Sequence, residues 1–495
     1  MLKLDHICIR AKERNTAICQ YEPIESLMEE KYNSDPNSLQ LVRKFEHQLK
    51  KGILDFFSEE DFEFIIDYYN NKKKFDKALN ASSIAIERFP YSTELKFSKA
   101  QILSNMGHYE EALELLDSAL IYQPNDEEIL LVKGSIYSLM GKHKLAIKEY
   151  EKVLENSEAK DEILYNIGMA YQNSGQYEHA IVNYEKALEV NLNNENVLYE
   201  LAYCLDITGK LEESISYYKE FIDKDPYSQY GWYNLGIVYN KLENFEEAVN
   251  AYEFAIAIDE KFASAYFNLG NTHMSLGNYT KALDSYKKTL DIEGPTSETS
   301  CCIAVAYEKL EQYELGIKYY QKAIKLDNFN DEAWFGVGIC LNAQDKWYEA
   351  IHFLNKALKF DPENAEYWTA VAETEYKLGN IVSSLDAYEE VCILDPENKD
   401  IWLKWSQIYY EQGDFEKAIS IIQRGIEQLP DDSDLYYRAT AYLIAAGKYK
   451  DAFVYLENAL VLNFENHTVL LEFFPKLQTQ KALFKIIDQY RKENF

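Results

Sequence analysis

Residues 232–255 read WYNLGIVYNKLENFEEAVNAYEFA, and this stretch decides the fold. Apolar residues recur in it three or four positions apart, as they do on one face of a helix, at Trp232, Leu235, Gly236, Tyr239, Ala248, Tyr252 and Ala255. Polar residues interrupt this pattern around 240–244. The stretch therefore predicts one helix, a turn and a second helix.

The same arrangement recurs at a constant spacing of 34 residues from Glu59 to Asn466, without an insertion or a deletion. A fixed period of this length is the mark of a repeat architecture. Twelve units fit, and they begin at residues 59, 93, 127, 161, 195, 229, 263, 297, 331, 365, 399 and 433.

Small residues at two places in each unit predict a close crossing of the two helices. The twentieth residue is Ala, Ser or Gly in every unit, and the eighth is small in every unit but the first, which has Ile66. The fifteenth residue is Gly in eight units, where the first helix must end and the chain must turn. Six of the ten prolines occupy the thirty-second position and would end the second helix.

With these positions in place, the stretch at 232–255 resembles the tetratricopeptide repeat, and the resemblance extends over residues 59–466. It implies an all-α fold, an α-solenoid of twelve 34-residue helix-turn-helix repeats that forms a right-handed superhelix with a concave inner face. Ser82 and Ser300 stand where the family usually has large residues, so we expect the first and eighth units to be less regular.

The ends of such an array need caps, because a single repeat cannot bury its apolar face alone. We expect residues 38–58 to form an N-terminal capping helix, followed by a capping box at Ser58 to Asp61. Residues 467–495 would form C-terminal capping helices. Residues 1–37 show no period and are expected to be poorly ordered, with Met28 as an alternative start of the chain.

The charge of the chain bears on its partners, since 83 Asp and Glu against 51 Lys and Arg give a net charge of −32. Nucleic-acid backbones and anionic membranes bind clustered basic residues, so we expect neither nucleic acid nor membrane insertion. Seven scattered cysteines without a CxxC pair are typical of reduced thiols, which favours a cytoplasmic protein.

Motifs for catalysis, metal or cofactor binding are hard to find in this sequence. Gly336 and Gly338 begin like a dinucleotide-binding loop, but Leu341 replaces the next required glycine. The eight histidines form no HExxH motif, and Cys301-Cys302 has no histidine near it in sequence. We expect a non-catalytic protein without a metal site or cofactor.

One stripe of the first helices is expected to face a partner, because positions 4, 7, 8 and 11 would pack against neighbouring helices. The family resemblance places this stripe on the concave groove. From the fourth to the seventh unit it carries aromatic, sulfur-containing and amide side chains: Tyr165, Asn166, Met169, Tyr199, Tyr203, Tyr230, Tyr233, Asn234, Ile237, Phe267, Asn268 and Asn271. Glu200 interrupts the series of asparagines at the sixth position. These residues could equally be ordinary surface or packing residues of the family.

The second position is acidic in nine units and would give the groove a negative edge. A protein or peptide partner with basic and apolar residues would suit it. The family's clamp for acidic C-terminal peptides needs Lys and Arg where this chain has Phe267, Cys302 and Phe335. We therefore expect an interaction scaffold, with a regulatory or assembly subunit that self-associates through the array as the alternative; the oligomeric state is left open.

Overall fold

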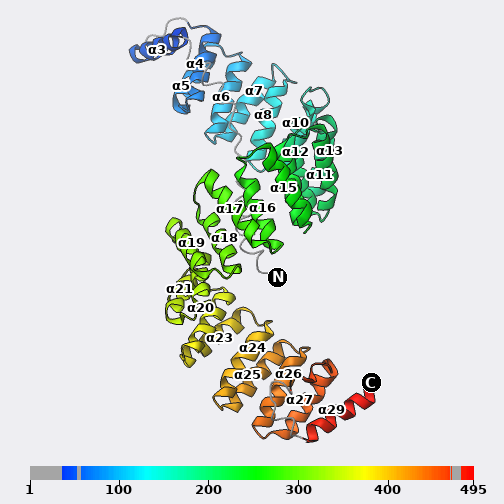
Figure 1. Ribbon diagram of the computed structural model, residues 1–495. Helices are drawn as coiled ribbons and strands as arrows, with labels where there is room; N and C mark the ends of the chain where they lie inside the picture. The colour runs from blue at the N-terminus through cyan, green and yellow to red at the C-terminus, as the bar shows by residue number, and fades with distance from the viewer. Residues whose placement is uncertain (1–35, 53–56, 469, 471–480, 495) are drawn as a thin grey trace. The chain divides into compact units, whose positions relative to one another are not determined.

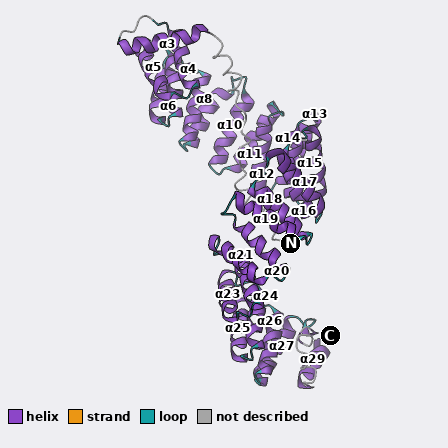
Figure 2. Cartoon of the chain, turned by 60° about the vertical axis from the view of Figure 1, so that its left-hand side comes forward, coloured by secondary structure: helices purple, strands orange, loops and turns teal. Residues whose placement is uncertain are grey.

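The computed structural model describes residues 36–52, 57–468, 470 and 481–494, and these ranges contain helices, turns and loops but no strand (Figures 1 and 2). The chain divides into two compact units, residues 1–272 and 273–495. Within each unit, consecutive helices pack against each other in pairs, and short turns join them. The prediction of an all-α solenoid of helix pairs is confirmed.

The first unit begins with α3 (Pro36–Lys51) and continues with paired helices. The first helices of its repeats are α4 (Glu59–Asn71), α6 (Thr93–Asn105), α8 (Glu127–Leu139), α10 (Lys160–Asn173), α12 (Glu195–Ile207), α14 (Gln229–Lys241) and α16 (Ala263–Ser275), near whose end the unit boundary falls. The second helices are α5 (Phe75–Arg88), α7 (Tyr109–Leu120), α9 (His143–Leu154), α11 (Tyr177–Val190), α13 (Ser214–Lys224) and α15 (Phe245–Ile258).

The second unit repeats the same alternation of helices. It contains α17 (Tyr279–Glu293), α18 (Ser297–Lys309), α19 (Tyr313–Leu326), α20 (Asp331–Ala343), α21 (Trp347–Phe360), α22 (Ala365–Lys377), α23 (Ile381–Leu394), α24 (Lys399–Glu411), α25 (Phe415–Gln428), α26 (Ser433–Ala445), α27 (Tyr449–Leu462) and α29 (Lys481–Asn494). The first helix begins at the first position of every repeat except the fourth, where α10 begins one residue earlier.

Small residues allow the two helices of a repeat to cross closely, as predicted. The eighth and twentieth residues are buried in all twelve repeats. A Cβ atom on Gly236 would lie 2.7 Å from Cε1 of Tyr252, and one on Gly338 would lie 2.5 Å from Cδ2 of Leu354. The eighth position is therefore small because it faces the large twenty-fourth residue of its own repeat.

The turn within each repeat has a left-handed backbone at the fifteenth position. The eight glycines there have φ between 71° and 81°. The other four repeats keep this conformation with Lys73, Glu243, Glu311 and Asp345, whose φ values are 54° to 60°. A non-glycine residue in this region carries a backbone strain of roughly 1 kcal/mol or more. The turn geometry is thus maintained even where glycine is absent.

In most repeats, the first helix begins at a side chain that caps it from the thirty-fourth position of the preceding repeat. This side chain accepts hydrogen bonds from backbone N–H groups in the first turn of the helix. The capping box at Ser58 and Asp61 is confirmed, with both reciprocal bonds present. Ser92, Asp126, Asn194, Ser228, Thr296, Asn330, Asn364 and Asp432 also accept from backbone N–H groups of the next first helix. Such caps satisfy N–H groups that have no partner within the helix.

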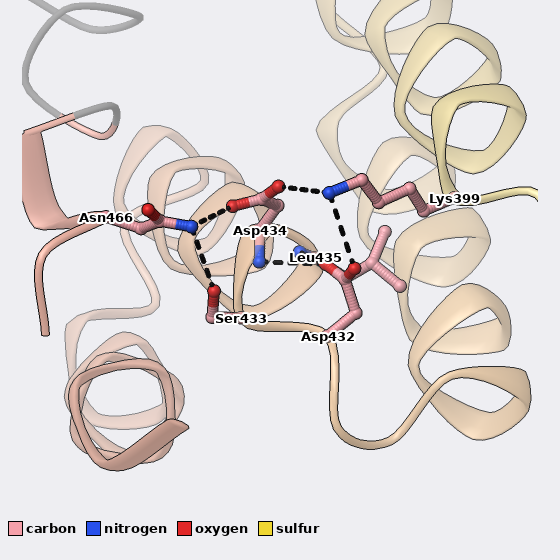
Figure 3. A network of polar contacts seen from close by, with 6 residues as sticks. All are labelled: Lys399, Asp432, Ser433, Asp434, Leu435 and Asn466. Atoms are coloured by element: carbon pink, nitrogen blue, oxygen red, sulfur yellow. Dashed lines mark hydrogen bonds and ion pairs between the residues drawn. The ribbon is translucent and has the colours of Figure 1, made fainter. Parts of the chain in front are cut away.

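Side chains also bridge successive repeats near these caps. Figure 3 shows Lys399 at the start of α24, whose Nζ lies 2.7 Å from Oδ2 of Asp434 in the first turn of α26. Asn466, after α27, donates to the other carboxylate oxygen of Asp434 at 2.9 Å and to Ser433 at 3.3 Å. One carboxylate therefore links residues of three neighbouring segments of the second unit.

Two single residues show how the helices are packed and closed. Trp232 is half-buried; its ring stacks on that of Phe254 with the centroids 4.5 Å apart, and its Nε1 donates to the carbonyl oxygen of Pro226. We expected the eighth unit to be less regular because of Ser300, but α18 runs as one helix through this residue. The buried hydroxyl of Ser300 donates to the Thr296 carbonyl oxygen at 2.7 Å. The small side chain is accommodated by this local bond.

The predicted end segments are described only in part. Residues 1–35 and 471–480, which include most of the expected disordered segment and part of the C-terminal cap, lie outside the described residues. In α3, Phe45 is buried with its ring 6.0 Å from that of Phe62. In α29, Ile487 is buried and the Tyr490 ring stacks 5.9 Å from that of Phe464. These contacts support capping roles for 38–58 and 467–495, which remain a prediction.

Candidate functional site

The twelve candidate residues lie on four first helices of the first unit, and we call them the α10–α16 surface. Tyr165, Asn166 and Met169 lie on α10, Tyr199 and Tyr203 on α12, Tyr230, Tyr233, Asn234 and Ile237 on α14, and Phe267, Asn268 and Asn271 on α16. None of them is buried. Tyr199, Tyr203 and Tyr230 are exposed to 46%, 41% and 40%, and the other nine are half-buried.

The exposure of the α12 tyrosines follows from the helix geometry. Val197, Leu201 and Cys204 of α12 are buried at the third, seventh and tenth positions. Tyr199 and Tyr203 are one turn apart and lie on a different face of the same helix. The third and tenth positions were missed as core positions, although they are buried in nearly every repeat.

Other members of the surface are held by internal packing. The Tyr165 ring lies 6.0 Å from that of Tyr184, which is fully buried. The Tyr233 ring lies 4.8 Å from that of Phe262, and its hydroxyl oxygen accepts from Nδ2 of Asn268 at 2.9 Å. Tyr233 and Asn268 therefore have structural roles, so the amide of Asn268 is already engaged at its nitrogen.

Glu200 lies beside this surface and was not among the predicted residues. Its Oε2 accepts a hydrogen bond of 2.6 Å from Nε2 of Gln172 on α10. Oε1 of Gln172 in turn accepts from the Tyr184 hydroxyl at 2.7 Å and from the Cys204 thiol at 3.1 Å. The sequence gives one sign that Glu200 is special. It stands at the sixth position of its repeat, where the neighbouring repeats of this surface have asparagine.

The charge of Glu200 acts on several of its neighbours. Burial and the charge of Glu200 together raise the pKa of Tyr165 and of Tyr184 above the ordinary tyrosine value. The same two causes raise the pKa of the Cys204 thiol to about 12. The pKa of Tyr203 is raised by burial and then by nearby Tyr177, Cys204, Glu200 and Asp206. These thiol and phenol groups are therefore protonated and uncharged at neutral pH.

In the described part of the chain, no three His, Cys, Asp or Glu residues are grouped to hold a metal ion. The described helices include none with the length and apolar character needed to cross a membrane. Cys301 and Cys302 are buried, and burial raises the pKa of Cys301, which disfavours the reactive thiolate.

Comparison with protein families identifies the repeats. Models described as tetratricopeptide repeat match residues 72–136, 309–373 and 376–441, residues 162–194 and 263–293, and residues 127–160 and 195–227; a model described as TPR repeat matches 238–277. The chain belongs to the tetratricopeptide-repeat family. Its repeats provide a scaffold for protein–protein interaction, the general role of this repeat class.

Solved structures of other proteins, among them one described as a TPR protein, are similar to parts or most of this chain. YrrB, described as having an unusual peptide-binding site, is 23% identical over 37% of this chain and 93% of its own, with a TM-score of 0.32. MamA is 29% identical over 33% and 95%, with a TM-score of 0.30. The Cut9–Hcn1 hetero-tetramer structure of the APC/C matches at 13% identity over 91% and 96%, with a TM-score of 0.38. Comparison with curated proteins finds no match.

Proposed function

We propose that this tetratricopeptide-repeat protein is a non-catalytic scaffold that holds a segment of another protein against the α10–α16 surface. The observation that carries the proposal is the exposure of Tyr199, Tyr203 and Tyr230 on consecutive first helices. Exposed aromatic residues that gather on one surface are typical of protein interfaces, where Tyr is enriched among the residues that contribute most to binding.

The neighbouring half-buried residues would order the side chains of this surface before a partner binds. Tyr165 and Tyr233 are fixed by rings of the core, and Tyr233 is also fixed by Asn268. A surface whose side chains are already ordered loses less conformational entropy on binding. The proposal therefore assigns the fixed residues to shape and the exposed tyrosines to anchoring contacts.

The charge of the protein supports a partner with basic and apolar residues. Nine repeats carry Asp or Glu at the second position, and the net charge is −32. Acidic surfaces accelerate the approach of basic segments and disfavour acidic ones. We propose a cytoplasmic setting, which the five described cysteines, all buried and outside any disulfide, support.

A binding measurement with a double variant tests the proposal. A partner captured from the native cell would be titrated against the full chain and against Tyr199→Ala/Tyr203→Ala. We expect the double variant to bind more weakly by about 2–4 kcal/mol, with its melting temperature nearly unchanged. Tyr233 is left unchanged in this variant, because it accepts the hydrogen bond from Asn268 and its loss could disturb the structure.

The matched control is Tyr348→Ala on α21, since Tyr348 is exposed to 81% and lies in the second unit. Full retention of affinity by the Tyr199/Tyr203 double variant would place the interface on another surface. Sedimentation of the free protein addresses the alternative, self-association: a concentration-dependent oligomer that the double variant leaves intact would favour it.

A further inference from the structure

We propose that Glu200, with Tyr165 and Tyr203 beside it, forms a site for one cationic side chain, Lys or Arg, of the bound partner. We call these three residues the Glu200 site. The inference rests on the proposed function and names the chemistry by which the same surface would select its partner.

The first argument is the state of the carboxylate. Among the described residues, Glu200 takes part in no ion pair, and its carboxylate accepts a hydrogen bond from the neutral amide of Gln172. Asp206, six residues further along α12, differs because it is paired with Lys241. The half-buried charge of Glu200 is thus held in place but not neutralised within the described part of the first unit. Such a charge is stabilised by a cation brought by a ligand.

The second argument is that Glu200 is preorganised. Gln172 is itself fixed by the buried Tyr184 hydroxyl and by Cys204, so the carboxylate is held by a chain of bonds that begins in the core. A flexible surface glutamate would lose side-chain entropy on pairing, and this cost cancels much of the benefit of an exposed ion pair. For Glu200 that ordering has already occurred in the folded protein.

The third argument concerns the rings. Tyr203 follows Glu200 by three residues on α12, so the two side chains are neighbours on the helix surface. Tyr165 on α10 lies near enough for the charge of Glu200 to act on its hydroxyl. Tyrosine rings within about 6 Å of a cation add attraction through their faces. A carboxylate beside two rings accommodates the charge of Lys or Arg together with its apolar stem.

Neutral and acidic side chains fit this site poorly. A partner carboxylate would meet the unneutralised charge of Glu200, and a purely apolar side chain would cover that charge without pairing it. Glu200 would therefore act as a specificity-determining residue, and the Tyr199 and Tyr203 rings would supply affinity for many sequences.

Selection from a library of random short peptides tests the inference on the full chain. We expect peptides selected by the parent protein to be enriched in Lys or Arg next to apolar residues. Glu200→Gln keeps an oxygen that can accept from Gln172, so the fold should persist, yet the selected peptides should bind roughly tenfold more weakly. Glu200→Lys should shift selection toward Asp and Glu. Glu189→Gln, which removes an exposed charge from α11, is the matched control and should bind as the parent does.

The outcomes separate this inference from the proposed function. If Glu200→Gln binds the parent's peptides as well as the parent does, while Tyr199→Ala/Tyr203→Ala loses them, the inference is wrong and the proposed function stands. If the double tyrosine variant also retains them, or no selected peptide depends on these tyrosines, the proposed function fails too. Thermal melting of each variant separates lost recognition from lost structure.

Discussion

The ring of Tyr184 occupies the space in which a side chain on Gly168 would lie. A Cβ atom on Gly168 would be 2.4 Å from Cε1 of Tyr184, far closer than carbon atoms approach without displacement. The same tyrosine is fully buried and donates to Gln172, which holds Glu200. The close crossing inside the fourth repeat is thus connected to the α10–α16 surface.

We expect Gly168→Ala to destabilise the protein by about 1–3 kcal/mol relative to Gly316→Ala, because the added methyl forces Tyr184 to move. Both substitutions gain similar helix propensity, and a Cβ on Gly316 would be 3.2 Å from Sγ of Cys340, a milder contact. Urea unfolding followed by circular dichroism measures the difference. Equal stability of the two variants would mean that Tyr184 relaxes without cost.

The turn of the sixth repeat should become more stable when Glu243 is replaced by Gly. Glu243 has φ of 60°, a strained value for a residue with a side chain. We expect a gain of about 1 kcal/mol after the greater flexibility of glycine in the unfolded chain is deducted. The reciprocal change, Gly277→Ala at φ of 73°, should lower stability by a similar amount. Differential scanning calorimetry would show the opposite shifts, and shifts of the same sign would contradict the explanation.

Glu308 should make the protein less stable as the pH rises. Burial raises the pKa of Glu308 above 4.5, although the hydrogen bond from Tyr320 opposes this shift. The folded state therefore keeps its proton to a higher pH than the unfolded state, so the free energy of unfolding decreases from about pH 4.5 upward through the folded pKa. We expect Glu308→Gln to reduce this decrease and to melt at a higher temperature than the parent at neutral pH.

Melting curves over the same pH range provide the check for Glu308, with Glu314→Gln on the exposed face of α19 as the control. A parallel pH dependence in the parent and Glu308→Gln would show that other groups dominate, and would refute the assignment.

Salt should act on the partner's association rate more than on its dissociation rate. The acidic residues at the second positions attract a basic segment at long range, and this attraction is screened within about 10 Å at 0.1 M salt. Surface plasmon resonance of a captured partner at several salt concentrations gives both rates. An association rate that does not change with salt would exclude electrostatic steering by these residues.

The fold could be predicted because its main constraint lies in the sequence itself. Small residues at the eighth and twentieth positions recur at a fixed interval, and all of them are buried in the structure. The left-handed turn at Lys73, Glu243 and Glu311 could not be derived in the same way, since Lys and Glu seldom adopt that conformation. Their neighbours in the repeat impose it.

The candidate site could be predicted only in part, as Tyr199 and Tyr233 show. Both occupy the fifth position of a first helix, so the pattern treats them alike. Tyr233 contacts Phe262, which stands at the thirty-fourth position before α16, where the corresponding residue before α14 is the capping Ser228. The role of Glu200 was equally hidden, because Gln172 lies 28 residues away on another helix.

The bonds from the thirty-fourth to the first position determine where the chain can be divided into exchangeable modules. Ser228 donates to Glu195, Asn330 to Ser297 and Asn466 to Ser433, each across nearly a whole repeat. In a chimera joined at the start of a first helix, the two partners of such a bond come from the same parent, because both belong to one repeat. A junction in the turn at the fifteenth position separates them, although that turn has the same backbone conformation in every repeat. The unit suited to recombination therefore runs from the start of one first helix to the start of the next, and contains a first helix followed by its second.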